Sequence, residues 1–161
     1  MKKFICMVIS VILFTACSMP DVYTDHPIQS MSQDEIINEV LRCFDEDDTT
    51  KLKELFCPKT IENVVALDEQ IKTAMEFYDG KHLSYDDIIV NGRAAKSASG
   101  FDPVITGLMT DTGKRYYIWI NSYVVNAHNP EYVGISSISV KLMGADDSAE
   151  NTYVEVGEYI E

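Results

Sequence analysis

The chain changes its hydrophobic pattern about halfway along its length. Between residues 31 and 79 apolar residues recur every three or four positions, which is the spacing of amphipathic helices. From Leu83 onward apolar and polar residues alternate, as they do on half-buried strands. Helices gathered first and strands gathered second predict an α+β domain, with N-terminal helices packed on one face of a curved antiparallel sheet.

The helical half opens with a capping box. Residues 32–35 read SQDE, with serine at the cap and glutamate three positions later. The apolar residues that follow share one helical face: Ile36, Ile37, Val40, Leu41 and Phe44. The acidic run 45–48 interrupts this face and is placed to cap a second helix, which ends before Pro58. We therefore predict a hairpin of two short helices.

A third helical pattern covers residues 60–79, and Gly80 is a natural terminator. Asp68 falls on its apolar stripe, and two interpretations fit. Asp68 either breaks the segment and caps a second piece, or it points a carboxylate toward the core. The cap is favoured, because burying a lone carboxylate is costly.

The second half of the chain contains about four or five strand patterns. They cover residues 85–97, 104–110, 115–126 and 133–143, with a weaker pattern at 153–158. Residues 111–113 read DTG, which is a tight hairpin signal between two of these strands. The predicted sheet is therefore largely an antiparallel meander.

The N-terminus has the layout of a signal peptide. Lys2 and Lys3 precede an apolar run over residues 4–16, which is shorter than the roughly 20 residues that a membrane-spanning helix needs. Residues 18–30 are polar, contain two prolines and lack an apolar period. We expect a signal peptide over 1–16, a flexible spacer over 17–30 and a single domain over 31–161.

Residues 13–17 read LFTAC and resemble the lipobox of bacterial lipoproteins, although that family usually has leucine where Phe14 stands. The resemblance implies that Cys17 receives a diacylglyceryl group and becomes the new N-terminus. It also implies a lipid-anchored protein at the cell membrane that faces outside the cytoplasm, since several acyl chains make a lasting tether. The alternative is an ordinary secretory signal that Cys17 follows by chance.

Charge and cysteine content narrow the function classes. The formal net charge of −13 repels phosphate backbones, which disfavours nucleic acid as a partner.

Cys43 and Cys57 lie in the predicted helical half, and buried free thiols are favoured over a disulfide because Cys43 shares an apolar face. No zinc pattern occurs. Counting from Asp45, an EF-hand loop lacks its glycine and glutamate, so the run 45–48 is interpreted as a solvated connection between helices. No metal or cofactor is expected.

The order of elements also resembles a known fold. A capped helix, KLKELF at 51–56, EFYDG at 76–80 and a long meander resemble the nuclear transport factor 2-like (cystatin-like) cone. From lipobox to last strands the chain is similar to small Firmicutes lipoproteins that carry a domain of unknown function. This resemblance implies a fold and a location without an assigned activity. Its superfamily also contains acid–base enzymes and homodimers that pair through the outer face of the sheet.

The segment RYYIWINSYVVN at 115–126 holds the main ligand-binding candidates. By the two-residue period Tyr117, Trp119 and Tyr123 share one face of this strand. They would either line a concave wall for an apolar or sugar-like ligand or fill the core, and the core is favoured. Arg93 would recognise a carboxylate if it points inward, whereas a solvated arginine is the simpler interpretation.

No catalytic motif is present in the sequence. Asp68 or Asp102 with Tyr117 or Tyr123 would supply an acid–base pair, while His26, His82 and His128 lie outside the predicted strands. The leading hypothesis is a non-catalytic, membrane-tethered domain that binds a small ligand or an envelope protein. The alternative is a small isomerase or dehydratase that uses a carboxylate and tyrosines in the cone.

Overall fold

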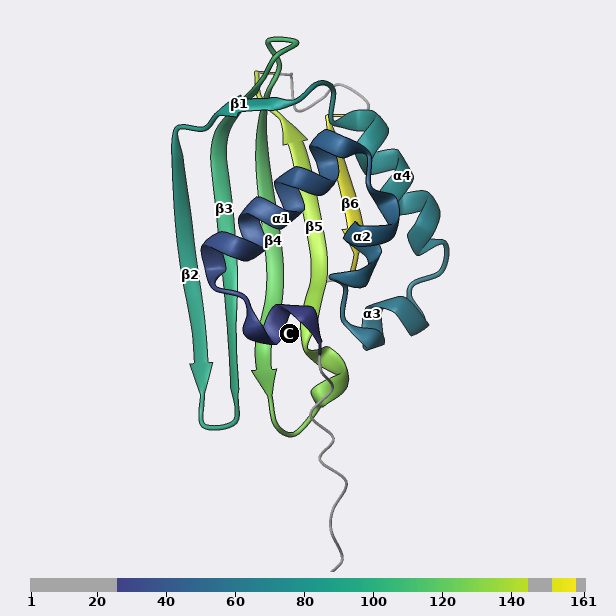
Figure 1. Ribbon diagram of the computed structural model, residues 1–161, viewed down its shortest axis with the longest axis vertical. Coiled ribbons are helices and arrows are strands. Elements are labelled where there is room, and N and C mark those ends of the chain that lie inside the picture. Colours follow the sequence, from purple (N-terminus) through teal and green to yellow (C-terminus); the bar gives the residue numbers. More distant parts are fainter. Residues whose placement is uncertain (1–25, 145–151, 159–161) are drawn as a thin grey trace, which may run out of the picture.

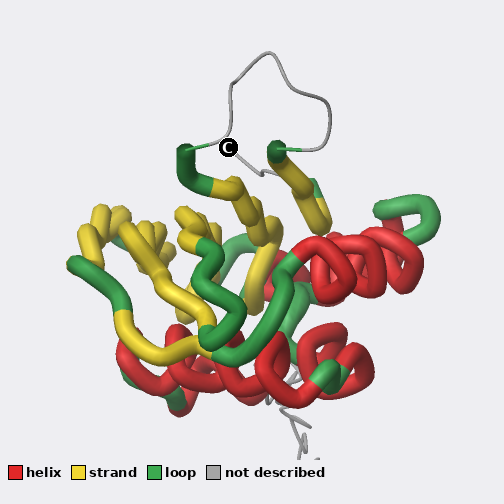
Figure 2. Tube along the Cα trace, turned by 90° about the horizontal axis from the view of Figure 1, so that it is seen from above, coloured by secondary structure: helices red, strands yellow, loops and turns green. Residues whose placement is uncertain are grey.

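The computed structural model describes residues 26–144 and 152–158. These residues form four α-helices and one open, antiparallel sheet of six strands. The helices lie on one side of the sheet, as Figures 1 and 2 show. The α+β class is therefore confirmed, with one strand more than the upper bound predicted from the sequence. Cys17, the signal peptide and most of the predicted spacer lie outside the described residues.

The helical layer contains α1 (Gln33–Glu46), α2 (Thr49–Glu54), α3 (Pro58–Asn63) and α4 (Leu67–Phe77). At the start of α1 the Ser32 hydroxyl accepts the Glu35 N–H at 3.3 Å, and the Glu35 carboxylate accepts the Ser32 N–H at 2.7 Å. The predicted capping box is thus confirmed. Asp48 caps α2 by accepting the N–H of Lys51 at 2.9 Å, also as predicted. None of the described helices is long and apolar enough to cross a membrane.

The third helical pattern is divided, but Asp68 does not cap the second piece. The N-cap of α4 is Ala66, a left-handed residue with φ of 61° and no side-chain cap. Asp68 lies in the first turn of α4, is 72% exposed and contacts Nζ of Lys53 at 2.7 Å. The predicted break is therefore confirmed, while the predicted capping residue is wrong. A carboxylate in the first turn still interacts favourably with the helix dipole.

The sheet consists of β1 (His82–Ser84), β2 (Asp87–Ala95), β3 (Ala98–Thr110), β4 (Arg115–Asn126), β5 (Gly134–Leu142) and β6 (Tyr153–Gly157). The strand order is β1-β3-β4-β5-β6, and β2 also pairs with β3. The strand predicted over residues 85–97 thus corresponds to β2, β1 is a short strand that the sequence did not predict, and β3 begins earlier than the expected residue 104. Short turns join β2 to β3 and β3 to β4, so these three long strands form a meander.

The side of the sheet that faces the helices is filled. Its fully buried side chains include Ile105, Leu108, Tyr116, Ile118, Ile120, Ile138 and Val140. The hydroxyl of Tyr116 donates to the Phe77 carbonyl at 3.1 Å and accepts the Asp79 N–H at 3.0 Å. These bonds hold the end of α4 against the sheet and satisfy the hydroxyl of a fully buried tyrosine.

Residues 26–30 belong to the folded domain, although the sequence places them in the spacer. Pro27–Ser30 form a 3-10 helix in which Ile28 is fully buried. His26 Nε2 donates to the Phe56 carbonyl at 3.1 Å, which leaves Nδ1 to accept the Ile28 N–H at 3.4 Å. Among the described residues, the folded part therefore includes His26 and the residues that follow it.

The link between α2 and α3 is attached to β5 like an additional strand. The Cys57 N–H donates to the Ile135 carbonyl, and the Ile135 N–H donates to the Leu55 carbonyl, both at 2.8 Å. Gly134 lies against Cys57, where an added Cβ would come within 2.6 Å of the Cys57 backbone. Cys43 and Cys57 are both free and buried, in agreement with the favoured interpretation of the sequence.

Candidate functional site

The aromatic stripe of β4 lies on the sheet face opposite the helices. Tyr117, Trp119 and Tyr123 are half-buried there, whereas Tyr116, Ile118 and Ile120 fill the core. The sequence-based preference for the stripe as core is therefore wrong. The two-residue period was right, but it cannot tell which face the helices cover. Within the described residues the helices occupy only the other side (Figure 2).

Cross-strand neighbours extend this stripe over the sheet. One row runs through Ile89, Val104, Trp119, Ser139 and Glu155. A second row runs from Tyr117 through Lys141 to Tyr153. The rings of Tyr117 and Trp119 lie 5.6 Å apart, and Ile89 and Tyr153 are 51% and 46% exposed. We call this surface, centred on Trp119, the outer face.

Arg93 organises a polar cluster on the outer face. Its Nη2 contacts Oδ1 of Asp102 at 2.7 Å, its Nη1 donates to the Tyr123 hydroxyl at 3.2 Å, and its guanidinium lies 4.4 Å from the Tyr123 ring centroid. Burial raises the pKa of the Asp102 carboxyl, while the arginine opposes that shift. Because Arg93 is already paired within the chain, it is not held in reserve for a ligand carboxylate.

The catalytic candidates from the sequence do not converge. Asp68 is on the surface of α4 and paired with Lys53. Asp102 and Tyr123 meet only through Arg93, on the open outer face. In the described parts of the chain these four candidates form no acid–base pair inside a cavity. His128 is exposed in the connection between β4 and β5.

A pocket of about 560 Å³ lies where α1 and α4 end beside the β3–β4 turn. It is lined by Phe44, Asp45, Asp47, Met75, Glu76, Tyr78, Asp79, Gly80, Lys81, Asp111 and Thr112. Five carboxylates and a single lysine give this pocket an acidic character. Several of the carboxylates are engaged in the fold, since Asp79 pairs with Lys114 at 2.9 Å and Asp111 accepts the Lys81 N–H at 2.9 Å.

Asp45 is the most connected group of this pocket. Its carboxylate accepts the His82 N–H at 2.9 Å, lies 2.5 Å from His82 Nδ1 and accepts the Tyr78 hydroxyl at 3.5 Å. Burial, with Asp45 nearby, raises the pKa of the Tyr78 hydroxyl above its ordinary value. The sequence interpretation of residues 45–48 as a solvated connection is thus wrong for Asp45, whose side chain is 15% exposed. No local motif joins two residues so far apart in the chain.

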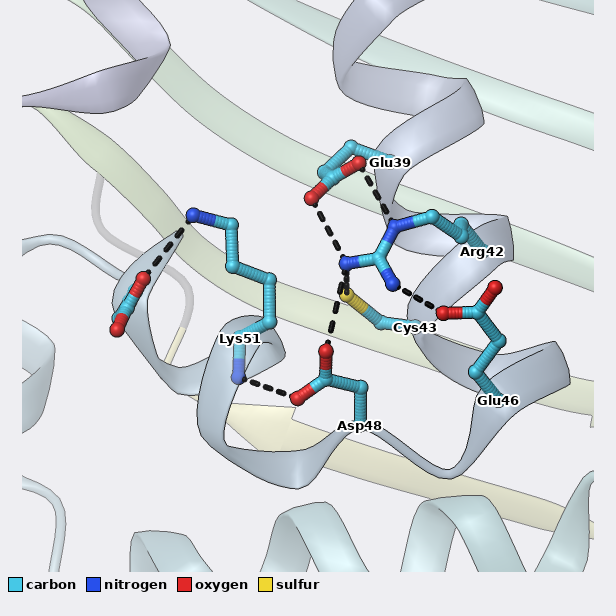
Figure 3. A network of polar contacts seen from close by, with 7 residues as sticks. Glu39, Arg42, Cys43, Glu46, Asp48 and Lys51 are labelled. Atoms are coloured by element: carbon cyan, nitrogen blue, oxygen red, sulfur yellow. Dashed lines mark hydrogen bonds and ion pairs between the residues drawn. The ribbon is translucent and has the colours of Figure 1, made fainter.

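Glu46 and Asp48, from the rest of the acidic run, form contacts at the turn between α1 and α2, as Figure 3 shows. Arg42 contacts Glu39 at 2.9 Å, Asp48 at 3.4 Å and Glu46. Asp48 also caps α2, so one arginine links both helices (Figure 3). Among the described residues no group of three or more His, Cys, Asp or Glu side chains is arranged to hold a metal ion. The contacts of Arg42 and Asp48 stabilise the turn between α1 and α2.

The fold and its surfaces define an α+β domain with helices on one face of an open sheet and an aromatic patch on the other. The chain belongs to DUF5104, a family defined by a domain of unknown function, which matches residues 39–146. This span begins within α1 and continues past the end of β5, so it includes β4 with its aromatic stripe and the acidic pocket. No curated protein matches the chain.

Proposed function

We propose that this DUF5104 protein is a lipid-anchored, extracytoplasmic binding domain of the nuclear transport factor 2-like fold. Cys17 carries the anchor, and the outer face docks another protein of the cell envelope. The lipobox-like segment supports the anchor, and the order of helices and strands supports the fold. The protein acts as a binding module and not as a catalyst.

The observation that carries this proposal is the apolar content of the outer face. Tyr117, Trp119 and Tyr123 are half-buried on it, and Ile89 and Tyr153 are about half exposed beside them. These side chains share one face of the sheet with polar residues such as Ser139 and Lys141, and exposed apolar side chains gathered on one face are typical of protein-binding sites on soluble domains. Tyrosine and tryptophan are also the residues that most often dominate the binding free energy of protein interfaces.

Two further features favour a protein partner over a small ligand held within the fold. The helix-facing side of the sheet is filled by side chains that are fully buried, so the space between the layers is already occupied. The net charge of −13 favours a partner whose surface around the contact is basic. The expected partner therefore presents an apolar centre and a rim of lysine and arginine.

Site-specific photo-crosslinking in cells that produce the full chain tests this proposal. A photoreactive residue at Trp119 or Tyr153 is expected to capture the same partner, and one at the exposed Glu69 of α4 is not. Adding Tyr117→Ser to the Trp119 probe should reduce the capture at least about tenfold, which corresponds to 1.4 kcal/mol. Equal capture of the partner by the probes at positions 119, 153 and 69, or no capture by any of them, would rule out the outer face as the docking surface.

A specific observation also supports a second candidate, a small acid–base enzyme. The contact between Asp45 and His82 Nδ1 holds the ring in one orientation and leaves Nε2 as the group for proton transfer. Exchange of α-protons of a panel of small ketones in heavy water tests for such a base. Exchange that is lost in His82→Gln and Asp45→Asn supports the enzyme, and exchange at the uncatalysed rate excludes it.

A further inference from the structure

The long strands run between two ends of the domain that differ in their content. The β2–β3 turn (96–97) and the β4–β5 connection (127–133) lie together at one end, where the Ala127 N–H donates to the Ser97 carbonyl at 2.7 Å. The β3–β4 turn (111–114) lies at the other end, beside the acidic pocket (Figure 1). We call these the proximal end and the distal end.

The first described residue enters the fold closer to the proximal end. His26 bonds to the Phe56 carbonyl, and Phe56 bridges Ile135. Ile135 is paired with Ser122, which lies four residues before the proximal end of β4 and seven residues after Arg115 at its distal end. At about 3.3 Å per residue these separations along the strand are about 13 Å and about 23 Å.

Charge is distributed unequally between the two ends. At the distal end the pocket contributes five carboxylates and Asp86 a sixth, against Lys81, Lys114 and Arg115. At the proximal end the β2–β3 turn, the β4–β5 connection and the 3-10 helix 27–30 together contain one lysine and one glutamate, Lys96 and Glu131. The distal end is therefore acidic, and the proximal end is neutral.

We propose that the proximal end faces the surface of the membrane and that the distal end, with the acidic pocket, points away from it. This orientation rests on the proposed lipid anchor at Cys17. Nine residue steps separate Cys17 from His26. A chain of that length spans about 15–18 Å when it is not stretched, and at most about 30–32 Å.

The length of this tether favours the proximal end. Its unstretched span covers the distance of about 13 Å from the entry point of the chain to the proximal end of β4. To place the distal end on the membrane, the tether would have to cover more than about 23 Å, because the β3–β4 turn extends beyond the strand. Such stretching removes conformational entropy from the tether.

Charge favours the same end when the membrane contains anionic lipid. Lys96 and His128 are exposed at the proximal end, and a lysine near an anionic surface is attracted to the phospholipid headgroups. The carboxylates of the distal end are repelled by the same headgroups. Two independent features of the chain therefore select one orientation.

This orientation goes beyond the proposed function, because it determines how the docking surface is presented. The strands run from the proximal to the distal end, so the outer face stands at the side of the domain. A partner attached to the same membrane can then lie alongside it. The acidic pocket becomes the part of the domain that lies farthest from the lipid.

Contact quenching by labelled lipid tests the orientation. The lipidated full chain is reconstituted in vesicles of phosphatidylcholine and phosphatidylglycerol that carry a nitroxide on the headgroup. Dyes are attached at His128→Cys or Thr112→Cys, two exposed positions, while Cys43 and Cys57 are buried. The dye at position 128 should be quenched at least about threefold more strongly, because the length of β4, about 36 Å, separates the two positions.

Two variants test the two causes separately. Inserting about nine glycine and serine residues between Pro20 and Asp21 raises the unstretched span to about 21–25 Å and should reduce the ratio of quenching at positions 128 and 112. Lys96→Glu should reduce quenching at position 128, because it places a carboxylate against the headgroups. Lys72→Glu, an equal change of charge on the exposed surface of α4, should not reduce it.

Flotation of the vesicles separates this inference from the proposed function. A full chain that does not float with the vesicles refutes the anchor and the orientation together. A chain that floats, but is quenched equally at both positions or more strongly at position 112, keeps the anchor and overturns the orientation. Quenching that changes neither with the insertion nor with Lys96→Glu would also overturn it.

Discussion

The carboxylate of Asp45 contacts both the backbone N–H and the ring Nδ1 of His82, at 2.9 and 2.5 Å. Asp45 lies in the last turn of α1 and His82 begins β1. This pair therefore joins the first helix of the domain to the first strand of the sheet. The Tyr78 hydroxyl contacts the same carboxylate at 3.5 Å, so the end of α4 belongs to the same junction.

We predict that Asp45→Ala lowers the free energy of unfolding by about 1–3 kcal/mol, because the variant leaves half-buried donors without an acceptor. Urea denaturation followed by circular dichroism measures the change. Glu62→Ala, which removes an exposed carboxylate of α3, should stay within about 0.5 kcal/mol of the natural chain. Equal losses in both variants would show that Asp45 does not hold this junction.

The stability of the domain should fall in acid partly because of His26. Burial lowers the pKa of His26 below its ordinary value of 6.5, against the opposing effect of its bond to Phe56. A lowered pKa means that the unfolded chain takes up the proton more readily. This stabilisation is therefore fully present above pH 6.5 and is lost as the pH falls below that value and through the lowered pKa of the folded state. Protonation also converts the Nδ1 acceptor of the Ile28 N–H into a donor.

Denaturation at about pH 7.5 and about pH 5.5 tests this linkage. His26→Asn should reduce the difference in unfolding free energy between the two conditions. His128→Asn, which changes an exposed histidine, should keep the difference of the natural chain. An unchanged difference in His26→Asn would assign the acid sensitivity to other groups.

Gly134→Ala should be among the most destabilising single substitutions in the sheet. Gly134 has φ of 130°, and an added Cβ would lie 2.6 Å from the Cys57 backbone. We expect a loss of about 2 kcal/mol or more from backbone strain and collision. Gly92→Ala is the matched control, because its Cβ would meet nothing within 4 Å. Thermal unfolding at low protein concentration compares the two, and similar melting temperatures would contradict the prediction.

Cys17→Ser should abolish incorporation of a labelled fatty acid and release the protein from the membrane fraction. The expectation follows from the lipobox-like segment and from the strength of attachment that several acyl chains provide. Cys6→Ser, which alters a cysteine within the apolar run, should still be labelled. Labelling that survives Cys17→Ser would contradict lipidation at this residue.

Local signals in the sequence predicted local structure well. The capping box at Ser32, the cap supplied by Asp48 and the DTG turn between β3 and β4 all depend on residues a few positions apart. The division of the third helical pattern was also predicted, but its left-handed cap at Ala66 was not. Alanine disfavours that conformation, so tertiary packing and not local preference determines this turn.

The sequence predicted the candidate site less well than it predicted local structure. The site depends on which face of the sheet the helices cover, and on contacts between residues that lie far apart in the chain. Alternation grouped Tyr117 with Trp119 and Tyr123 correctly, yet it could not place them away from the helices. The contact of Asp45 with His82 joins residues 37 positions apart, and Arg93 meets Tyr123 over 30 positions. Neither pair has a local sequence signature.

The attachment of the α2–α3 link to β5 determines the order in which the chain can fold. The Cys57 N–H donates to the Ile135 carbonyl and the Ile135 N–H donates to the Leu55 carbonyl, and α4 packs beside β6, the last described strand. Contacts of such large sequence separation form late, because the long intervening loop must first be closed. An emerging N-terminal half therefore cannot reach its final packing until the C-terminal strands follow it. The N-terminal half therefore stays extensible until β5 and β6 are available, which is the state that the proposed extracytoplasmic location would require for passage through a narrow channel.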